Sequence, residues 1–216
     1  MLGAVLGQPG APLRILCLGA HCDDIEIGCG GTLLRLLAER PGSTVYWAAL
    51  TSTPEREREA RACATEMLSD AADRTIVINS FRDGYLPFQG AEVKDFFEAT
   101  KRAVQPDLIL THHRHDRHQD HRMIAEMTWN TFRDHLIVEF EIPKYEGDLG
   151  TPNFFVPLSE ATVRRKIDLI LRSFPSQVGK RWFRAETFEA VLRLRGIECN
   201  AREGFAEAFH ASKLVI

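Results

Sequence analysis

Residues 19–31 decide the fold of this chain, and they read Gly19-Ala20-His21-Cys22-Asp23-Asp24-Ile25-Glu26-Ile27-Gly28-Cys29-Gly30-Gly31. The apolar run over residues 13–18 before this stretch predicts a buried β-strand, and the apolar spacing of residues 32–38 after it predicts a helix. One histidine and three carboxylates therefore lie within six residues at a strand-to-helix turn. Open α/β sheets bind their ligands at such turns, so we expect a cation there.

The rest of the chain alternates strand and helix patterns. Apolar runs predict further strands over residues 44–50, 75–78, 108–111 and 136–140. Helical spacing between them predicts helices over residues 54–68, 93–104 and 122–132. This alternation predicts an α/β fold, a Rossmann-like three-layer sandwich with a mostly parallel central sheet.

The C-terminal third predicts one more strand and two helices. Pro157 makes residues 153–157 an edge strand, Ser159 caps a helix that runs through Leu171, and Gly196 stops a helix over residues 185–194. We expect a flexible leader over residues 1–12, which are rich in Gly and Pro, and a single domain over residues 13–216.

Composition excludes several classes of protein. The chain has 216 residues, a formal net charge of −3 and a pI near 6.2, so it has no basic field to hold nucleic acid. No apolar run is long enough to cross a membrane, and we expect a cytoplasmic protein. The five cysteines form no C-x-x-C pair, so neither a disulfide framework nor a thiolate zinc site is indicated.

Two clusters of histidine and carboxylate indicate a metal site. His21 and Asp24 can converge on one point while Asp23 is directed elsewhere, and five of the eight histidines lie in residues 112–121. Loops that follow parallel strands meet at one edge of a sheet, so a third ligand is expected from His118 or His121. We favour His121 because it opens a helix. Catalytic zinc sites have three such ligands and an open position.

The remaining polar groups predict metal-assisted hydrolysis of an amide or ester. A divalent ion activates a water molecule by lowering its pKa toward ~7, and Asp23 is the candidate general base. His118 would stabilise the oxyanion or protonate the leaving amine, oriented by Asp116 or Asp120. Glu26 is expected to satisfy backbone donors at the helix start.

Simpler interpretations exist for each cluster alone. An Asp-Asp pair at a strand end is usually a helix cap, and a histidine-rich loop is often only solvated. Residues 28–31 are a weak signal for a nucleotide-binding module without catalysis. A structural zinc site normally has four ligands and is rich in cysteine. The two clusters together favour a catalytic metal, and His112, His113 and His115 are left without an assigned role.

The motifs resemble those of a known family, the PIG-L/LmbE-like zinc-dependent N-acetylglucosaminyl deacetylases. Residues 20–26 are similar to its A-H-P-D-D-x-E motif, and residues 118–121 to its H-P-D-H motif. Four further elements of the family have counterparts in Arg56 with Glu59, Phe81-Arg82-Asp83-Gly84, Ser176-Gln177 and Ala206-Glu207-Ala208-Phe209. Cys22 and Gln119 replace the prolines of the two motifs, which changes loop rigidity but removes no ligand.

The resemblance implies Zn²⁺, or another divalent ion, on His21, Asp24 and His121, with Asp23 as general base and His118 as electrostatic stabiliser or acid. It further implies that Arg56 and Asp83 contact the sugar of a small N-acetylated amino sugar, free or conjugated, which is deacetylated. The protein would then be an N-deacetylase, and a homo-oligomer in common with many family members. The alternatives are an amidase on a thiol-sugar conjugate and the nucleotide-binding module.

Overall fold

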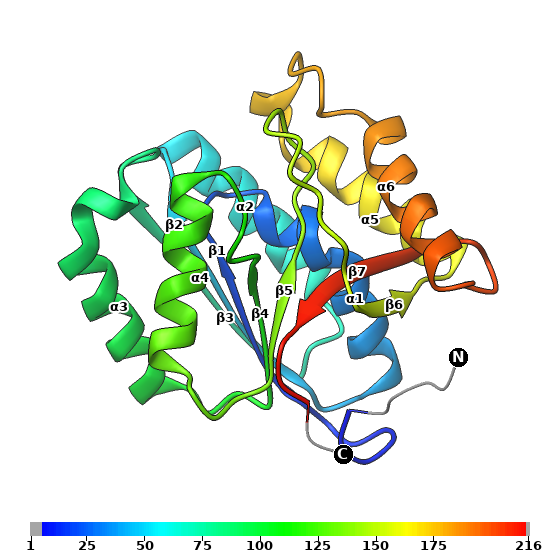
Figure 1. The fold of residues 1–216 in the computed structure, drawn as a ribbon, viewed down its shortest axis with the longest axis horizontal. Coiled ribbons are helices and arrows are strands. Elements are labelled where there is room, and N and C mark those ends of the chain that lie inside the picture. The colour runs from blue at the N-terminus through cyan, green and yellow to red at the C-terminus, as the bar shows by residue number, and fades with distance from the viewer. Residues whose placement is uncertain (1–5, 215–216) are drawn as a thin grey trace.

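The computed structural model describes residues 6–214, and its core is a seven-stranded sheet (Figure 1). The strands are β1 (Arg14–Gly19), β2 (Thr44–Thr51), β3 (Asp73–Phe81), β4 (Leu108–His112), β5 (Ile137–Phe140), β6 (Phe154–Pro157) and β7 (Ala206–Ala211). Their order is β3-β2-β1-β4-β5-β7-β6. The first five are parallel, and β7 pairs antiparallel with β5 and β6. The mostly parallel α/β sheet and the edge position of β6 are both confirmed.

Helices cover both faces of the sheet and complete the three layers. They are α1 (Asp24–Glu39), α2 (Pro54–Met67), α3 (Gly90–Ala103), α4 (Gln119–Thr131), α5 (Glu160–Ser173) and α6 (Ala185–Glu198), with 3₁₀ turns η1 (Leu86–Gln89) and η2 (Pro175–Gln177). In Figure 1, α3 and α4 lie on one face and α1, α2, α5 and α6 on the other.

Side chains of β1 alternate between two hydrophobic cores, one on each face of the sheet. Ile15 and Cys17 pack with the core of α1, α2, α5 and α6, whereas Leu16 and Leu18 pack with that of α3 and α4. This period of two is what a strand buried on both faces requires. The apolar run that predicted this strand therefore serves both cores.

Helix α1 begins at Asp24, eight residues before the expected start at Thr32. The expectation was wrong because glycines disfavour helices by themselves, whereas tertiary packing stabilises them here. A β-carbon on Gly28 would lie 2.4 Å from the Phe140 ring, and one on Gly31 would lie 2.5 Å from Leu158. The glycines let the helix pack closely beneath the turn, which accounts for them without a bound nucleotide.

The C-terminal region differs from expectation in two ways. Strand β7 was not predicted, because its alternation includes the buried Glu207, whose partner Lys166 is distant in sequence. Helix α6 continues through Gly196 to Glu198. A β-carbon on Gly196 would lie 2.2 Å from the carbonyl oxygen of Gly204, so this glycine allows close packing and does not end the helix.

The N-terminal leader lies partly outside the described residues, which begin at residue 6. The Arg40 guanidinium donates to the carbonyl oxygens of Leu6, Gln8 and Ala11 at 2.7, 3.2 and 2.9 Å. These bonds attach the approach to β1 to the end of α1. Within residues 6–214, no helix combines the length and the apolar character needed to cross a membrane.

Candidate active site

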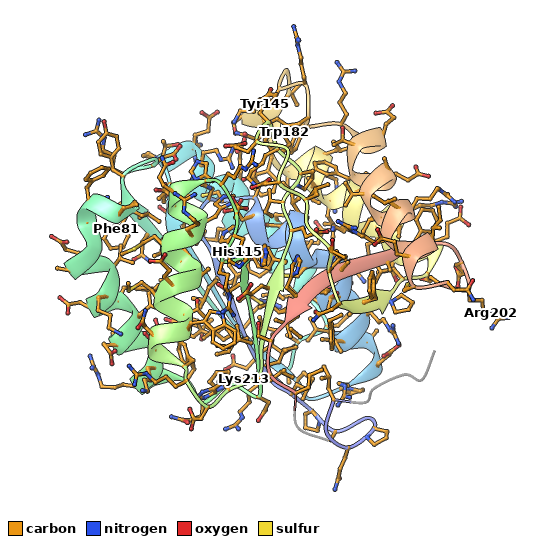
Figure 2. All side chains as sticks on the ribbon, in the orientation of Figure 1. Phe81, His115, Tyr145, Trp182, Arg202 and Lys213 are labelled. Atoms are coloured by element: carbon orange, nitrogen blue, oxygen red, sulfur yellow. The ribbon has the colours of Figure 1, made fainter. Side chains whose placement is uncertain are left out.

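A cavity of about 800 Å³ opens at the carboxyl edge of the parallel strands. The turns after β1, β2 and β3 form part of its wall, as do the segment before α4 and the loops that follow β5 and α5. Both sequence clusters face it, His21 to Asp24 from one side and His118 and His121 from another. Phe81, Tyr145 and Trp182 also line it, and in Figure 2 the last two lie at the same end of the molecule.

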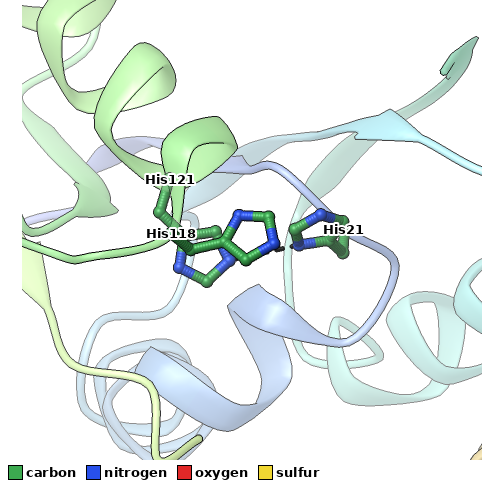
Figure 3. A group of neighbouring side chains, drawn as sticks. All are labelled: His21, His118 and His121. Carbon is green, nitrogen blue, oxygen red and sulfur yellow. Dashed lines mark hydrogen bonds between the residues drawn. The ribbon is translucent and has the colours of Figure 1, made fainter. Parts of the chain in front are cut away.

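His21, His118 and His121 converge although about a hundred residues separate them (Figure 3). β1 and β4 are parallel neighbours with Cys17 opposite Leu110, so the loops after them leave the sheet side by side. His21 follows β1 directly, and His118 is the N-cap of α4. The convergence predicted from parallel strand ends is present.

Three candidate ligand atoms form a compact triangle. His21 Nδ1 lies 3.2 Å from Asp24 Oδ2 and 3.1 Å from His121 Nε2, and the latter two atoms are 3.5 Å apart. Tetrahedral zinc with bonds of about 2.0–2.1 Å holds its ligand atoms about 3.3–3.4 Å from one another. The donor set and its spacing therefore fit a divalent ion. His112 Nε2 lies 3.1 Å from Asp24 Oδ2, but it accepts a hydrogen bond from the Ala20 N–H.

Asp23 is buried, and its two carboxylate oxygens differ in their surroundings. Oδ1 lies 2.8 Å from the Arg56 guanidinium, whereas Oδ2 is buried without a hydrogen-bond partner among the described residues. Burial raises the pKa of Asp23, and the positive charge of Arg56 opposes that rise. Its side chain makes no capping bond to α1. The carboxylate is thus oriented through one oxygen and free to accept a proton at the other.

His121 is oriented by Asp116. Its Nδ1 lies 2.9 Å from Asp116 Oδ2, which leaves Nε2 facing His21 and Asp24. Ligating histidines are commonly held by a carboxylate in this way. Burial raises the pKa of Asp116, but hydrogen bonds from His121 and Lys144 outweigh it and lower this pKa strongly. We expected Asp116 or Asp120 to orient His118; the Asp116 carboxylate instead bonds the His121 ring and the His118 backbone N–H.

His118 Nδ1 accepts a hydrogen bond from the backbone N–H of Asp120 at 3.3 Å. With Nδ1 as acceptor, the ring proton of neutral His118 belongs on Nε2. Burial and the neighbouring His21 lower the pKa of His118, which favours the neutral ring. The ring centroid lies 4.8 Å from that of His21 and 4.6 Å from that of His121. His118 can therefore offer an N–H to a ligand in the cavity.

Asp120 holds the loop that carries Asp83. Its carboxylate accepts hydrogen bonds from the N–H groups of Gly84 and Leu86 at 2.7 and 3.1 Å. Asp83 Oδ1 lies 3.0 Å from His21 Nε2, and Asp120 Oδ2 lies 3.5 Å from the same nitrogen. Both carboxylates thus stand behind His21, on the side away from Asp24. Asp83 also lines the cavity, within reach of a substrate.

The residues that replace the motif prolines have hydrogen-bonding roles of their own. Cys22 Sγ donates to the carbonyl oxygen of Thr51 at 3.4 Å. Gln119 Nε2 donates to the carbonyl oxygen of Gly84 at 3.2 Å. Each side chain links its turn to a neighbouring loop, so rigidity that a proline ring would supply comes here from hydrogen bonds.

The remaining histidines of the second cluster fall into two groups. His112 is buried beneath the site: Nε2 accepts from the Ala20 N–H at 2.9 Å, and its ring stacks on His121 at 3.9 Å. His113 faces away, bonding Glu139 at 2.7 Å and stacking on His210 at 3.8 Å. His115 pairs edge-on with His113. The strand register could have indicated His112, because the residue that ends β4 lies beside the turn after β1.

Glu26 does not satisfy backbone donors, contrary to expectation. It is fully buried, and neither carboxylate oxygen has a hydrogen-bond partner. Burial raises the pKa of Glu26 well above its usual range, which favours the neutral form of the side chain. The expectation failed because α1 starts at Asp24, which moves Glu26 from the cap into the first turn facing the core.

The sequence did not indicate several residues of the cavity wall. A contact with helix α2 links two of the elements that resemble those of the family, Arg56 with Glu59 and Ser176-Gln177. Glu59 on α2 accepts from the backbone N–H of Ser176 at 2.8 Å and from its hydroxyl at 2.5 Å. The Arg-x-x-Glu and Ser-Gln elements thus form one contact beside the cavity. Lys144, Lys180 and Trp182 line the wall without any sequence signal.

Comparisons with known proteins identify relatives in sequence and in fold. The uncharacterized deacetylase YaiS of Escherichia coli (strain K12) is 33% identical over 137 residues, which cover 57% of this chain and 70% of YaiS. The N,N'-diacetylchitobiose deacetylase of Pyrococcus horikoshii has a TM-score of 0.71 at 18% identity, covering 96% of this chain and 87% of that one.

The fold alone does not decide the chemistry. GalB, the 4-carboxy-2-hydroxymuconate hydratase of Pseudomonas putida KT2440, has a TM-score of 0.74 at 15% identity, covering 94% of this chain and 98% of GalB. Structures this distant in sequence show a shared fold only. The family assignment therefore rests on sequence: residues 16–132, which are 117 of the 216 residues, match the PIG-L family, and this chain belongs to that family of GlcNAc-PI de-N-acetylases.

Proposed function

We propose that this protein is a metal-dependent N-deacetylase that removes the acetyl group from an N-acetylated amino sugar, with Zn²⁺ or another divalent ion on His21, Asp24 and His121. The observation that carries the proposal is the triangle of ligand atoms with sides of 3.1, 3.2 and 3.5 Å at the floor of a large cavity. When bound, the ion supplies Lewis acidity and lowers the pKa of a water molecule toward ~7.

Asp23 is the general base of this proposal. Arg56 fixes Oδ1, so the partnerless Oδ2 is the atom that accepts the proton of the attacking water. A base held in one orientation beside the reacting atoms contributes about 10²–10⁴-fold to the rate. Arg56 also lines the cavity, where it can hydrogen-bond a sugar hydroxyl while it holds Asp23.

His118 stabilises the oxyanion as a neutral hydrogen-bond donor. Its Nδ1 is occupied by the Asp120 N–H, so Nε2–H is the group it can direct to the acetyl oxygen. Preorganised donors of this kind stabilise the negative charge that develops in acyl transfer. The sequence left two roles open for His118, stabilising the oxyanion and protonating the leaving amine. Its hydrogen bonding favours the first role.

The size of the cavity favours a conjugated sugar over a free one. About 800 Å³ lies near the upper end of the ~300–1,000 Å³ range for sites that enclose drug-sized ligands, and it exceeds the needs of one sugar ring. Tyr145 and Trp182 on its outer wall offer aromatic surface to a second group attached to the sugar. An amidase acting on a thiol-sugar conjugate has the same requirement and is the second candidate.

The test is release of acetate from free, glycosidically linked and nucleotide-linked N-acetyl amino sugars, after chelation and with zinc restored. We expect release that depends on the ion, and Asp23→Asn should lower kcat by about 10²–10⁴-fold while zinc binding persists. Asp134→Asn, an exposed carboxylate outside the cavity, is the matched control. Full activity of the chelated protein would refute the proposal, and cleavage of a conjugate amide without acetate release would favour the amidase.

A further inference from the structure

The loop between β5 and β6 carries a buried lysine that no motif predicted. Lys144 belongs to the cavity wall, yet its side chain is only 11% exposed. Its ammonium group lies 2.8 Å from Asp116 Oδ2 and 2.7 Å from Asp148 Oδ1. Burying an ammonium group costs free energy unless it is paired with carboxylates, and here two carboxylates pair with it.

One oxygen joins this lysine to the metal triangle. Asp116 Oδ2 accepts from Lys144 Nζ and also from His121 Nδ1, at 2.8 and 2.9 Å. The other oxygen, Oδ1, accepts from the His118 backbone N–H at 2.8 Å. The carboxylate that orients His121 is therefore itself held by Lys144 from the side of the loop.

Lys144 and its two carboxylate partners, Asp116 and Asp148, form a clamp. Its Asp148 end fixes the loop. Asp148 Oδ2 accepts from the Arg117 N–H at 2.7 Å, and the Arg117 guanidinium donates to the Glu146 carbonyl oxygen at 3.2 Å. The segment from Lys144 to Asp148 is thus attached at both ends to the turn before α4. Tyr145 lies inside this segment and is 72% exposed, at the same end of the molecule as Trp182 (Figure 2).

We infer that Lys144 is a positioning residue that couples the outer wall of the cavity to His121: through Asp116 it fixes the ligand ring, and through Asp148 it seats the loop that carries Tyr145. The inference rests on the proposed function only for the role of His121 as a ligand. Removing the ammonium group removes both contacts at once, because Lys144 is the side chain that joins Asp116 to Asp148.

Lys144→Met, which keeps the length of the side chain and removes its charge, tests the coupling. We expect zinc affinity, measured by competition with a chelator, to fall about 10-fold or more. The visible absorption of the Co²⁺-substituted protein should change because Asp116, which holds the His121 ring, loses its bond to Lys144. In the metal-free protein, residues 141–153 should be cleaved faster by a protease. Lys94→Met removes a lysine paired with Glu98 on α3 and should change none of the three readings.

Asp148→Asn separates the two halves of the clamp. It leaves Lys144 on Asp116, so loop cleavage should accelerate while zinc affinity and the Co²⁺ spectrum stay those of the wild type. Wild-type zinc affinity and loop cleavage in a folded Lys144→Met protein would overturn the inference. So would a fall in zinc affinity for Asp148→Asn equal to that for Lys144→Met. None of these readings requires turnover, so absence of acetate release refutes the deacetylase and leaves the coupling standing.

Discussion

Helix α1 contacts two groups of buried charge, and they differ in how fully they are satisfied. Beside its middle, Glu207 accepts from the N–H groups of Gly31 and Thr32 at 2.8 and 2.6 Å and from Lys166 at 2.6 Å. Lys166 also donates to the Ile27 carbonyl oxygen at 2.6 Å. Only a void of about 20 Å³, room for one water molecule, adjoins this pair.

At the N-terminus of the same helix the charges are only partly paired. Asp23 Oδ2 has no partner, and three imidazole nitrogens crowd around Asp24 Oδ2. This group opens on the cavity of about 800 Å³. A satisfied, closed charge pair holds a fold together, whereas an unsatisfied group that faces a cavity binds something from solution. From this difference we predict that the middle of α1 serves stability and its first turn serves chemistry.

Asp24→Asn should have the largest effect of these variants, and the effect should fall on zinc binding and activity rather than on folding. It removes one side of the ligand triangle, so we expect zinc binding and acetate release to be lost. The metal-free protein should stay folded and lose at most about 2 kcal/mol of its free energy of unfolding, because the amide oxygen still accepts from the His21 N–H while contacts with a charged group are lost. Denaturant titration with chelator present, beside metal analysis, measures both. A metal-free variant that fails to fold would break the comparison.

Lys166→Met should have the opposite profile. Removing one partner of a buried pair leaves the Glu207 charge uncompensated and costs about 3–5 kcal/mol. Zinc affinity should stay within about threefold of the wild type, since Lys166 contacts no ligand. Lys94→Met breaks an exposed pair and should cost about 1 kcal/mol or less, which makes it the control for loss of a lysine. Equal stabilities of the two variants would contradict the assignment.

The sequence was sufficient for the fold class and for the convergence of the two clusters. Apolar runs identify buried strands, and parallel strands place the residues after them at one edge, so His21, Asp24 and His121 could be grouped without coordinates. Their roles in binding a metal stay predictions. The early start of α1 could not be predicted, because the fit of Gly28 against Phe140 exists only in the packed protein.

The rest of the site depends on contacts between loops. Local spacing allowed either Asp116 or Asp120 to orient a histidine, and only the path of the turn before α4 shows that Asp116 reaches His121 and Asp120 reaches Gly84. Lys144 carries no motif, and its importance follows from the Asp116 oxygen that it shares with His121. The expected role of the buried Glu26 was wrong for the same reason as the expected start of α1.

A third buried carboxylate, Glu139, tests the comparison through the dependence of stability on pH. Its variant has the smallest expected effect. Burial would raise the pKa of Glu139, but hydrogen bonds from His113, Arg114 and Trp129 outweigh it and lower the pKa to about 2. Because the folded pKa lies below the unfolded value near 4.5, its stabilisation is complete above about pH 5 and is lost as pH falls toward 2. Glu139→Gln should therefore cost up to about 3 kcal/mol at neutral pH, a difference that shrinks steadily below pH 4.5. His210 lies opposite Glu139 in the sheet and has a pKa lowered to about 4 by burial and by His113, but it is present in both proteins.

Denaturant unfolding of the two proteins from pH 7 to 2.5 measures the difference. A difference that stays constant over that range would show that hydrogen bonding does not lower the pKa of Glu139, and would separate it from the satisfied pair of Lys166 and Glu207.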